Sequence, residues 1–333
     1  MATRWGICGA GNISHDFCVA LKTLPHKDHQ MVAVAARNLE SSEKFAKTHG
    51  IPTAYGSYHE LAKDPNIDVV YIGVLHTHHL QVGQLFLNSG KNVLCEKPFA
   101  INLREVKQLV AASRKNNVFL MEAVWSRCFP VYAEVGRLLS ESAIGEVKMV
   151  KAYFGLPLLD RIRTTQREGG GSLLDIGIYC LQFALMVFKG ERPESIHATG
   201  VRLPSGVDES MVVVLKFSGN RMAICACTLG CALPNDATIC GTKGSITVAH
   251  PMHCPTTLEV NGKRTEFPLP EPGIALNFMN STGLRYEAEE VRQCLQKGLK
   301  ESSKMSLTDS ELLIEIMDEA RRQVGVVYDQ DSQ

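Results

Sequence analysis

Residues 5–14 of the chain, WGICGAGNIS, place Gly9 and Gly11 between a short apolar run and the start of a helical pattern. Glycines at such a junction allow a tight turn and let the backbone approach a phosphate closely, while N–H groups at the helix start bind the anion. Ser14 stands where this motif usually has a third glycine. We expect the turn to bind the pyrophosphate of a dinucleotide. The residues expected to contact it are Gly9, Ala10, Gly11, Asn12 and Ile13.

The sequence around this turn alternates between strand and helix patterns. Apolar, β-branched runs indicate five strands, at residues 5–8, 30–37, 69–75, 92–95 and 118–124, with helical patterns between them. The run at 69–75, VVYIGVL, contains no charged residue, as in a strand buried on both faces. Residues 1–125 are therefore expected to form a Rossmann domain with a doubly wound parallel sheet, which binds the dinucleotide.

The regular alternation of strand and helix patterns ends after residue 125. Helical patterns occur at 130–140, 171–188, 284–297 and 307–324, and strand-like runs at 146–154, 195–203, 209–217, 221–229, 237–240 and 245–249. Most of these strands follow one another through short turns without a helix between them, which favours antiparallel pairing. We expect residues 126–333 to form a second domain, of the α+β class, with a mostly antiparallel sheet.

The composition excludes several classes of protein. The 333 residues carry 35 Lys and Arg against 35 Asp and Glu, so no excess of positive charge points to nucleic acid. Hydrophobic residues at 45% and charged residues at 21% indicate a globular chain. We find no signal peptide, lipidation motif or membrane-spanning run, and the eleven cysteines are scattered. A cytoplasmic protein with neither membrane nor nucleic-acid partner is expected.

The end of the second expected strand bears on the choice of cofactor. It reads Ala36-Arg37-Asn38, with no carboxylate to bind a ribose 2′-hydroxyl. The Arg37 guanidinium can bind a 2′-phosphate through two hydrogen bonds, which favours NADP over NAD. The alternative is that Arg37 is a solvated loop residue.

Two histidines, His76 and His79, follow the third expected strand. Their spacing resembles a metal cluster, but we expect no metal and interpret them as contacts to the cofactor or the substrate. The next strand ends in Cys95-Glu96-Lys97-Pro98, at the edge where open α/β sheets bind ligands. We expect Glu96 and Lys97 to contact the cofactor there.

A second motif occupies residues 169–179, GGGSLLDIGIY, in which Asp175 precedes Tyr179 by four residues. Together with the glycine turn and Glu96-Lys97-Pro98, it resembles the glucose–fructose oxidoreductase / inositol dehydrogenase / rhizopine-catabolism family over essentially the whole chain. Tyr179 departs from the pattern, since many members have histidine there. The resemblance implies an oxidoreductase that moves hydride between a small-molecule substrate and nicotinamide. It also implies that residues 126–333 bind the substrate and form an open-faced sheet, and that the chain is a homodimer through the strands of residues 195–249.

The Tyr-bearing motif, read with RWGI at 4–7, CEKP at 95–98 and MEAVWSRCFP at 121–130, narrows the implied activity. It implies NADP-dependent oxidation of trans-dihydrodiols of aromatic hydrocarbons to catechols, and of D-xylose to its lactone. One alternative is an NADPH-dependent reductase of dicarbonyl or biliverdin-like substrates. Another is a nucleotide sensor without catalysis, against which Lys97 and Tyr179 argue.

Alcohol oxidation requires a base for the hydroxyl proton. A free phenol, with a pKa of about 10, is a poor base, and a neighbouring ammonium favours the phenolate. Tyr179 is therefore the expected acid/base, with Lys97 lowering its pKa; which of them accepts the proton stays open. Asp175 is expected to bind a substrate hydroxyl or to pair with Lys97. The alternative for Tyr179 is a core tyrosine.

Aromatic residues in three segments suit a planar ring substrate. Trp125, Phe154 and Phe278 are expected to form a wall of the substrate site, with Arg127 nearby. The alternative for each ring is a place in the hydrophobic core.

Overall fold

A computed structural model of the chain describes residues 2–159, 165 and 168–332. They form two compact units. The first contains the described residues of the ranges 1–100, 104–128 and 269–307, and the second contains those of the ranges 101–103, 129–268 and 308–333. The sequence predicts a single division near residue 125, whereas the units are discontinuous, because the stretch 269–307 returns to the first unit.

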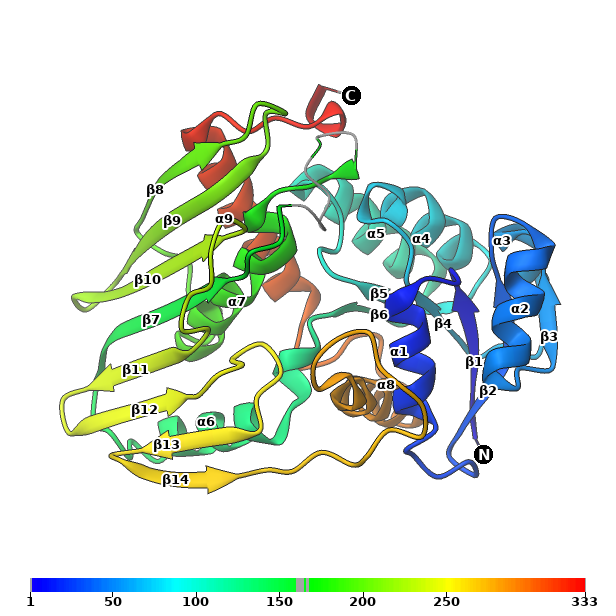
Figure 1. Ribbon diagram of the computed structural model, residues 1–333, viewed down its shortest axis with the longest axis horizontal. Coiled ribbons are helices and arrows are strands. Elements are labelled where there is room, and N and C mark those ends of the chain that lie inside the picture. Colours follow the sequence, from blue (N-terminus) through cyan, green and yellow to red (C-terminus); the bar gives the residue numbers. More distant parts are fainter. Residues whose placement is uncertain (1, 160–164, 166–167, 333) are drawn as a thin grey trace. The chain divides into compact units, whose positions relative to one another are not determined.

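The first unit is a parallel sheet between two layers of helices. Its six strands lie in the order β3-β2-β1-β4-β5-β6, the order in which two mononucleotide-binding halves meet between β1 and β4. Helices α4 and α5 lie on one side of this sheet, and α1 and α8 lie on the other (Figure 1). The strands are β1 (Thr3–Cys8), β2 (His29–Ala35), β3 (Thr53–Tyr55), β4 (Val69–Ile72), β5 (Asn92–Glu96) and β6 (Leu120–Ala123).

The helices of this unit comprise α-helices and short 3₁₀ turns. The α-helices are α1 (Asn12–Leu21), α2 (Leu39–His49), α3 (Tyr58–Lys63), α4 (His79–Asn88), α5 (Leu103–Asn116) and α8 (Arg285–Gln296). The 3₁₀ turns are η1 (His76–His78), η2 (Trp125–Cys128) and η5 (Ser281–Leu284). The doubly wound parallel sheet is thus confirmed, although β2 ends at Ala35, two residues earlier than expected.

Apolar burial on both faces explains why these strands form the centre of the unit. Every residue of β4 is buried, as its uninterrupted apolar run predicts. Beside it, the Phe17 ring of α1 stacks on Tyr71, with centroids 3.8 Å apart, and meets the edge of Trp5 at 5.2 Å. This aromatic packing fixes α1, and with it the glycine turn, against the middle of the sheet.

The second unit contains an eight-stranded sheet in the order β14-β13-β12-β11-β7-β10-β9-β8. Neighbouring strands pair antiparallel except β7 and β10, which run parallel because the chain crosses over through α7 and the β8–β9 hairpin before it returns. The strands are β7 (Val147–Gly155), β8 (Ser195–Arg202), β9 (Asp208–Phe217), β10 (Arg221–Thr228), β11 (Ala237–Gly241), β12 (Gly244–Val248), β13 (Thr257–Val260) and β14 (Lys263–Glu266).

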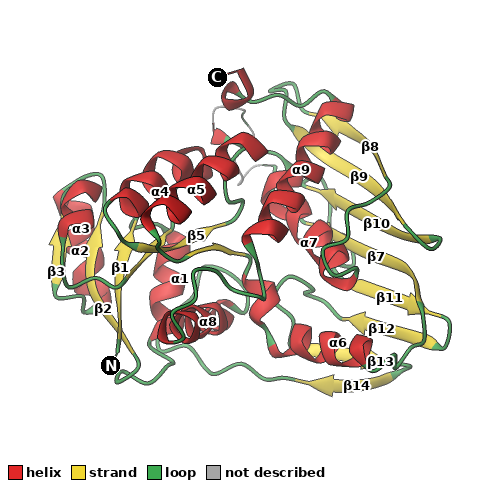
Figure 2. Ribbon diagram, turned by 180° about the vertical axis from the view of Figure 1, so that it is seen from behind, coloured by secondary structure: helices red, strands yellow, loops and turns green. Residues whose placement is uncertain are grey.

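One face of this sheet is covered by helices. These are α6 (Pro130–Ser140), α7 (Ile178–Val187) and α9 (Leu307–Val324), and Figure 2 shows them together on the same side. The side chains beneath them, such as Val150, Leu215 and Ile239, are buried. Val212, which lies between the buried Met211 and Val213 along β9, is 39% exposed and therefore faces the opposite side of the sheet. Figure 1 shows no helix of the described chain over that side. The open-faced, mostly antiparallel sheet is therefore confirmed.

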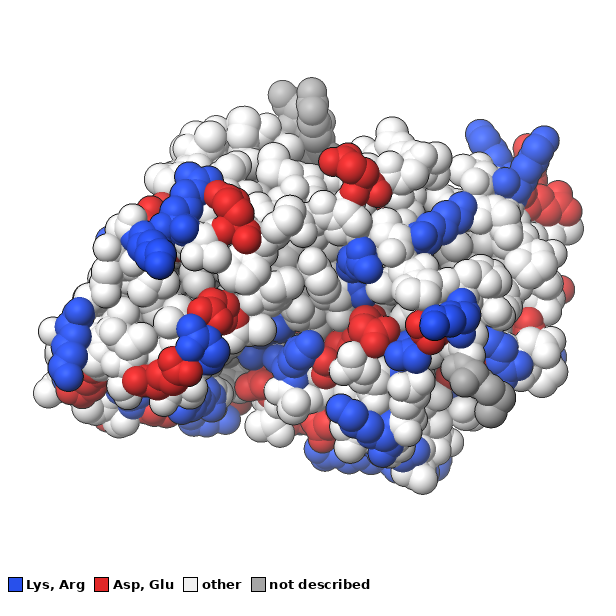
Figure 3. All heavy atoms as spheres, turned by 90° about the horizontal axis from the view of Figure 1, so that it is seen from below, with Lys and Arg blue, Asp and Glu red and all other residues white. Residues whose placement is uncertain are grey.

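The described surface carries charges of both signs. In Figure 3, Lys and Arg side chains lie interspersed with Asp and Glu over the face in view. Several form pairs, such as Arg137 with Glu134 and Glu141, both at 2.6 Å. None of the described helices has the length and apolar character needed to span a membrane.

Candidate active site

The glycine turn between β1 and α1 has a geometry that requires glycine at its first position. Gly9 has φ +100°, and a Cβ there would lie 2.9 Å from the Gly73 carbonyl oxygen. The turn is pinned on both sides, since Gly9 N–H donates to Ala35 O and Gly73 N–H donates to Cys8 O, each at 2.9 Å. The Ser14 side chain is buried against Gly73, where a Cβ on residue 73 would lie 2.4 Å from Ser14 Oγ. Gly73 thus provides the room that a third glycine would otherwise give.

The residues present fit a dinucleotide pyrophosphate. Gly11, with φ −91°, is the N-cap residue just before α1. No described side chain caps the helix, and its first turn contains no carboxylate. A Cβ at Gly11 would meet only the Gly73 oxygen, at 3.9 Å, so the packing of the protein does not require glycine there. A small residue beside uncapped N–H groups suits the close approach of a phosphate.

Arg37 lies just beyond β2, and its side chain is exposed. The next residue, Asn38, caps α2 by accepting from Ser41 N–H at 2.9 Å. Burial raises the pKa of Tyr58 to about 12, and the nearby positive charge of Arg37 opposes that rise. The guanidinium is therefore accessible at the end of β2, and its contact with a 2′-phosphate stays a prediction.

The two expected histidines are buried. His79 places Nδ1 2.9 Å from Pro98 O and Nε2 3.2 Å from Val74 O, so it connects the end of β4 with the Glu96-Lys97-Pro98 turn. The His76 ring lies edge-on to it, with centroids 6.3 Å apart. This arrangement gives His79 a role in holding the turn, and contacts of either ring with a cofactor stay a prediction.

The turn that carries Lys97 is fixed by two carboxylates. Glu96 accepts from the Tyr71 hydroxyl at 2.7 Å and from Lys97 N–H at 3.2 Å, and Glu122 accepts from Phe99 N–H at 2.9 Å. Burial raises the pKa of Glu96, while the Tyr71 hydrogen bond and the Lys97 charge act in the opposite direction. The peptide between Lys97 and Pro98 is cis. Lys97 itself is half-buried at the carboxyl end of β5.

The other expected substrate residues of the first unit differ in exposure. Trp125 and Arg127 lie in η2 and are buried, and Arg127 Nη1 donates to Lys304 O at 3.3 Å. Phe278, in contrast, is 48% exposed. The buried pair suits core packing as well as a pocket, so their contact with substrate stays a prediction.

The sequence predicts one continuous α-helix over residues 171–188. In the second unit, however, the segment that contains Asp175 and Tyr179 does not form one. Gly171 has φ +124°, which no helix accommodates, and the buried Asp208 carboxylate accepts from Ser172 Oγ and Leu173 N–H, both at 2.6 Å. Residues Leu173–Gly177 then form a π-helical turn that leads into α7. Such turns occur frequently at functional sites. Asp175, in this turn, is buried.

Tyr179 lies in a group of three rings. Phe154 of β7 is 5.8 Å from it between centroids, and His253 is 5.3 Å from it. The Phe154 and His253 rings stack at 4.4 Å. The group brings together the acid/base candidate Tyr179 and one residue of the expected aromatic wall. Sequence analysis did not identify His253.

The loop that carries His253 is held next to Tyr179 by a short chain of hydrogen bonds. Gln182 Nε2 donates to Tyr179 O at 3.1 Å and to the Tyr132 hydroxyl at 3.0 Å. That hydroxyl in turn donates to Met252 O at 3.1 Å. No local motif marks His253, because the contact depends on residues that are far apart in the sequence.

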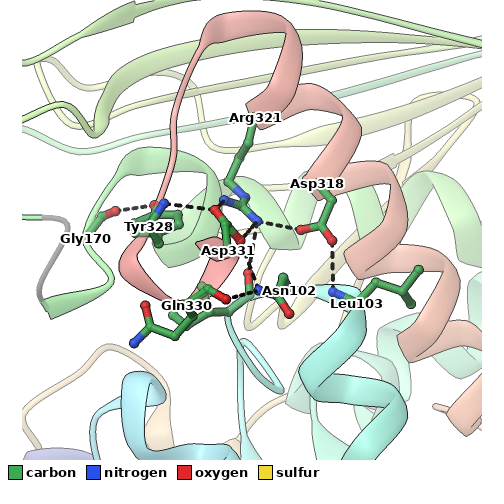
Figure 4. Close-up of polar contacts among 9 residues, drawn as sticks. Asn102, Leu103, Gly170, Asp318, Arg321, Tyr328, Gln330 and Asp331 are labelled. Carbon is green, nitrogen blue, oxygen red and sulfur yellow. Dashed lines mark hydrogen bonds and ion pairs between the residues drawn. The ribbon is translucent and has the colours of Figure 1, made fainter. Parts of the chain in front are cut away.

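The C-terminal segment braces the turn that precedes the motif (Figure 4). The Tyr328 hydroxyl donates to Gly170 O at 2.5 Å, and Tyr328 N–H donates to Asp331 at 2.9 Å. Arg321, almost fully buried, pairs with Asp331 at 2.7 Å and with Asp318 at 2.6 Å. Two carboxylates thus balance the buried guanidinium, and the network holds Gly170 in place.

The described side chains were also compared with the arrangement that a metal ion needs. In the parts of the chain that the structure describes, no three His, Cys, Asp or Glu side chains gather closely enough to hold a metal ion.

Comparison with known proteins identifies both halves of the chain. Residues 3–124 match the family described as an oxidoreductase family with an NAD-binding Rossmann fold, and residues 132–247 match the GFO/IDH/MocA C-terminal domain. A trans-1,2-dihydrobenzene-1,2-diol dehydrogenase of Danio rerio is 64% identical over 100% of both chains. The protein of that name from Homo sapiens is 46% identical over 99% of both chains.

Solved structures show the same fold. An aldose-aldose oxidoreductase from Caulobacter crescentus, complexed with glycerol, superposes with a TM-score of 0.83 at 21% identity, over 100% of this chain and 99% of its own. Levoglucosan dehydrogenase, in complex with NADH and levoglucosan, gives 0.83 at 19% identity, over 97% and 98%. The 3-ketoreductase KijD10 from Actinomadura kijaniata, in complex with NADP and TDP-benzene, gives 0.79 at 21% identity, over 97% and 98%.

Proposed function

Because the chain belongs to the GFO/IDH/MocA oxidoreductase family, we propose that it oxidises trans-dihydrodiols of aromatic hydrocarbons to catechols, with NADP as the hydride acceptor. The observation that carries this proposal is identity over the full length with curated relatives named trans-1,2-dihydrobenzene-1,2-diol dehydrogenase, from 64% in Danio rerio to 46% in Homo sapiens. D-xylose, oxidised to its lactone, is a second proposed substrate. Both substrates present a ring carbon that bears hydroxyl and hydrogen next to another hydroxyl.

The proposed chemistry assigns a proton step to this chain. Nicotinamide, when bound, supplies the acceptor for the hydride. Tyr179 takes the proton of the substrate hydroxyl, and the Lys97 ammonium favours the phenolate that does so. Asp175 binds a second hydroxyl of the substrate. The Phe154 and His253 rings next to Tyr179 support a planar substrate, since rings at such distances offer apolar stacking surface.

Substitution of Lys97 tests this assignment. We expect Lys97→Met to lose turnover by about 100-fold or more, because general acid–base assistance contributes about 10²–10⁴-fold. NADP binding, measured by quenching of tryptophan fluorescence, should change little. Lys115→Met is the matched control, because Lys115 lies in the last turn of α5 and has no proposed role. Turnover of Lys97→Met at the level of the control would remove Lys97 from the mechanism.

The preference for NADP rests on Arg37. Its exposed guanidinium at the end of β2 supports recognition of a 2′-phosphate, and the turn contains no acidic residue that would repel one. Arg37→Asp should raise the KM for NADP far more than the KM for NAD. An unchanged ratio of the two KM values would show that Arg37 does not recognise the 2′-phosphate.

A homodimer through the open face of the second sheet is also proposed. Val201 and Val212 on this face are 58% and 39% exposed, and such apolar exposure is costly in a monomer. A charge placed there by Val212→Glu should shift the mass measured by light scattering from dimer to monomer. Lys115→Glu, at an exposed position of α5 in the first unit, serves as the control. A monomeric wild-type chain would contradict the proposal.

For location, the chemistry of the cysteines supports the cytoplasm. All eleven are free thiols, and only Cys231 is exposed. Unpaired thiols suit a reducing compartment.

A further inference from the structure

Asp208, the first residue of β9, is a fully buried carboxylate that is bonded to the start of the π-helical turn. Its Oδ2 accepts from Ser172 Oγ and from Leu173 N–H, both at 2.6 Å. Leu173 N–H is one of the first N–H groups of the turn, which have no acceptor within the helix itself. The partial positive charge of a helix start favours a carboxylate there. Asp208 thus takes the place of a local cap, which the Ser172 side chain does not provide.

The residue before this cap, Gly171, is fitted to the same carboxylate. It has φ +124°, and a Cβ at this position would lie 2.4 Å from Asp208 Oδ1. Glycine is therefore required here both by the backbone angle and by the close approach of Asp208. The carboxylate contacts three consecutive residues of the chain, 171–173, and each contact restricts where the turn can begin.

The other end of the π-helical turn lies directly on the sheet. A Cβ at Gly177 would lie 2.7 Å from Cys227 Sγ of β10, so the backbone approaches this strand closely. The same sulfur lies 3.4 Å from Ser172 Oγ. Strands β9 and β10 are neighbours, with Cys227 opposite Met211. Both ends of the turn are therefore held against adjacent strands of one sheet.

The shape of the turn decides how the candidate catalytic side chains are oriented. Asp175 is in the middle of the turn, and Tyr179 is the second residue of α7. A turn with one residue more than an α-helical turn rotates the residues on one side of it by about 100° relative to those on the other. The orientation of Asp175 relative to Tyr179 therefore depends on whether the chain keeps this turn or relaxes to a regular α-helix.

We propose that Asp208 is a positioning residue for the oxidation: it fixes the start of the π-helical turn and so holds Asp175 and Tyr179 in the orientation that the reaction requires. The inference rests on the proposed function, which assigns the substrate hydroxyls to these two residues. Asp208 acts through Ser172 and Leu173 and does not itself touch substrate. Burial raises the pKa of Asp208, while the bonds from Ser172 and Leu173 act in the opposite direction and favour the carboxylate.

Substitution of Asp208 and Ser172 tests the proposal. Asp208→Ala leaves Ser172 Oγ and Leu173 N–H without their acceptor, and Ser172→Ala removes one of the two bonds. We expect kcat with benzene dihydrodiol, per NADP-binding site, to fall about 100-fold in Asp208→Ala, because a displacement of about 1 Å in an active site has this effect. Ser172→Ala should show a smaller loss, and the affinity for NADP should stay at the wild-type value in both.

Asp208→Asn is the conservative variant that should rescue activity. Its amide oxygen has two lone pairs and can accept both bonds in the place of Oδ2, although bonds to a neutral oxygen are weaker. Asp208→Asn should therefore recover most of the kcat that Asp208→Ala loses. The double variant of Ser172→Ala and Asp208→Ala should be no worse than Asp208→Ala, because both substitutions remove the same contact. Additive losses, or an Asp208→Asn variant as slow as Asp208→Ala, would overturn the proposal.

Leu215→Ala is the control for a purely structural role. Leu215 is buried in the same strand, and its truncation leaves a cavity without removing a bond to the turn. This variant should unfold at a lower temperature than wild type and keep its kcat per NADP-binding site. If Asp208→Ala loses no more kcat than Leu215→Ala, Asp208 serves stability alone.

A readout that does not need activity reports the turn itself. Hydrogen–deuterium exchange of the amides of residues 173–177 should be at least several-fold faster in Asp208→Ala than in wild type and in Leu215→Ala, because Leu173 N–H loses its acceptor. If Asp208→Ala does not fold, Ser172→Ala takes its place in the same comparisons, since it keeps the bond to Leu173 N–H. Unchanged exchange in the variant that folds would show that these bonds do not fix the turn.

The two proposals fail in different ways. A wild-type chain that oxidises no dihydrodiol, while exchange is faster in Asp208→Ala, contradicts the proposed function and with it the reaction assigned to the positioned residues. A wild-type chain that oxidises dihydrodiols, while Asp208→Ala and Ser172→Ala keep the full kcat, contradicts the inference alone.

Discussion

Replacing each glycine of the dinucleotide turn by alanine separates a folding role from a binding role. Gly9→Ala would place a residue at φ +100°, and its Cβ would lie 2.9 Å from the Gly73 carbonyl oxygen. Gly73 cannot easily move away, since its N–H donates to Cys8 O. A non-glycine residue at such a φ costs about 1–3 kcal/mol before the steric contact is counted. For a unit of this size, about 2–4 °C of Tm per kcal/mol predicts a fall of roughly 2–12 °C without cofactor.

Gly11→Ala is the matched control in the same turn. Its φ of −91° suits alanine, and the added Cβ meets nothing nearer than 3.9 Å. Without cofactor, its Tm should equal that of wild type or slightly exceed it, because alanine has less freedom in the unfolded chain. Its methyl group would, however, separate the backbone from a pyrophosphate. The loss of one charge-assisted hydrogen bond then predicts affinity for NADP lower by about 10- to 100-fold.

Differential scanning fluorimetry without cofactor, and titration calorimetry with NADP, measure the two effects separately. Gly9→Ala should lower Tm, and Gly11→Ala should lower affinity at unchanged Tm. Equal Tm values for Gly9→Ala and wild type would refute the argument from backbone geometry. Wild-type affinity in Gly11→Ala would show that no phosphate approaches the turn closely.

Three further predictions concern stability. Burial, together with the charges of His15 and Lys22, lowers the pKa of His49 from 6.5 to about 4. The stability that depends on neutral His49 is therefore complete above pH 6.5 and is lost as pH falls towards 4, by at most about 3 kcal/mol. In urea titrations, the free energy of unfolding of His49→Gln should fall less with acid than that of wild type. An identical fall in both proteins would contradict this. Burial and the charge of Glu96 raise the pKa of Glu287, whose oxygens have no hydrogen-bond partner among the described residues, so the stability of the protein falls as pH rises above 4.5. The stability of Glu287→Gln should match that of wild type near pH 5 and exceed it increasingly at higher pH, by up to about 1.4 kcal/mol per pH unit. A difference that stays constant with pH would refute this cause. Arg321→Met removes the buried guanidinium, leaves Asp318 and Asp331 without their cation and should lower the free energy of unfolding by about 3–5 kcal/mol. Arg322→Met, at an exposed ion pair, should change it by less than about 1 kcal/mol. Equal effects of the two substitutions would contradict the role of the network in Figure 4.

The fold could be predicted where apolar runs are long and regular. The buried run of β4 and the closely spaced strands after residue 195 identified a parallel sheet and a mostly antiparallel one. Short or polar strands were not predicted, because a periodic pattern can be recognised only in a segment that is long enough and has an apolar face. Strand β3 has only three residues, and every residue of β14, Lys-Arg-Thr-Glu, is exposed.

The site could be predicted only where a local motif exists. The glycine turn, Glu96-Lys97-Pro98 and the Asp175–Tyr179 segment are contiguous, so the sequence shows them directly. His253 carries no such signal, and it becomes informative only when its loop lies next to Tyr179. The π-helical turn was missed because a buried acid, Asp208, distant in sequence, shapes its start.

The most direct measurement is the initial rate of NADPH formation by the purified wild-type protein. It is followed by absorbance with NADP and either trans-benzene dihydrodiol or D-xylose, and Lys97→Met serves as the blank. The account predicts turnover of the dihydrodiol with a higher kcat/KM than that of D-xylose, and turnover lower by about 100-fold or more in Lys97→Met. Tight binding of NADP without oxidation of either substrate would contradict the account and favour a reductase or a nucleotide sensor.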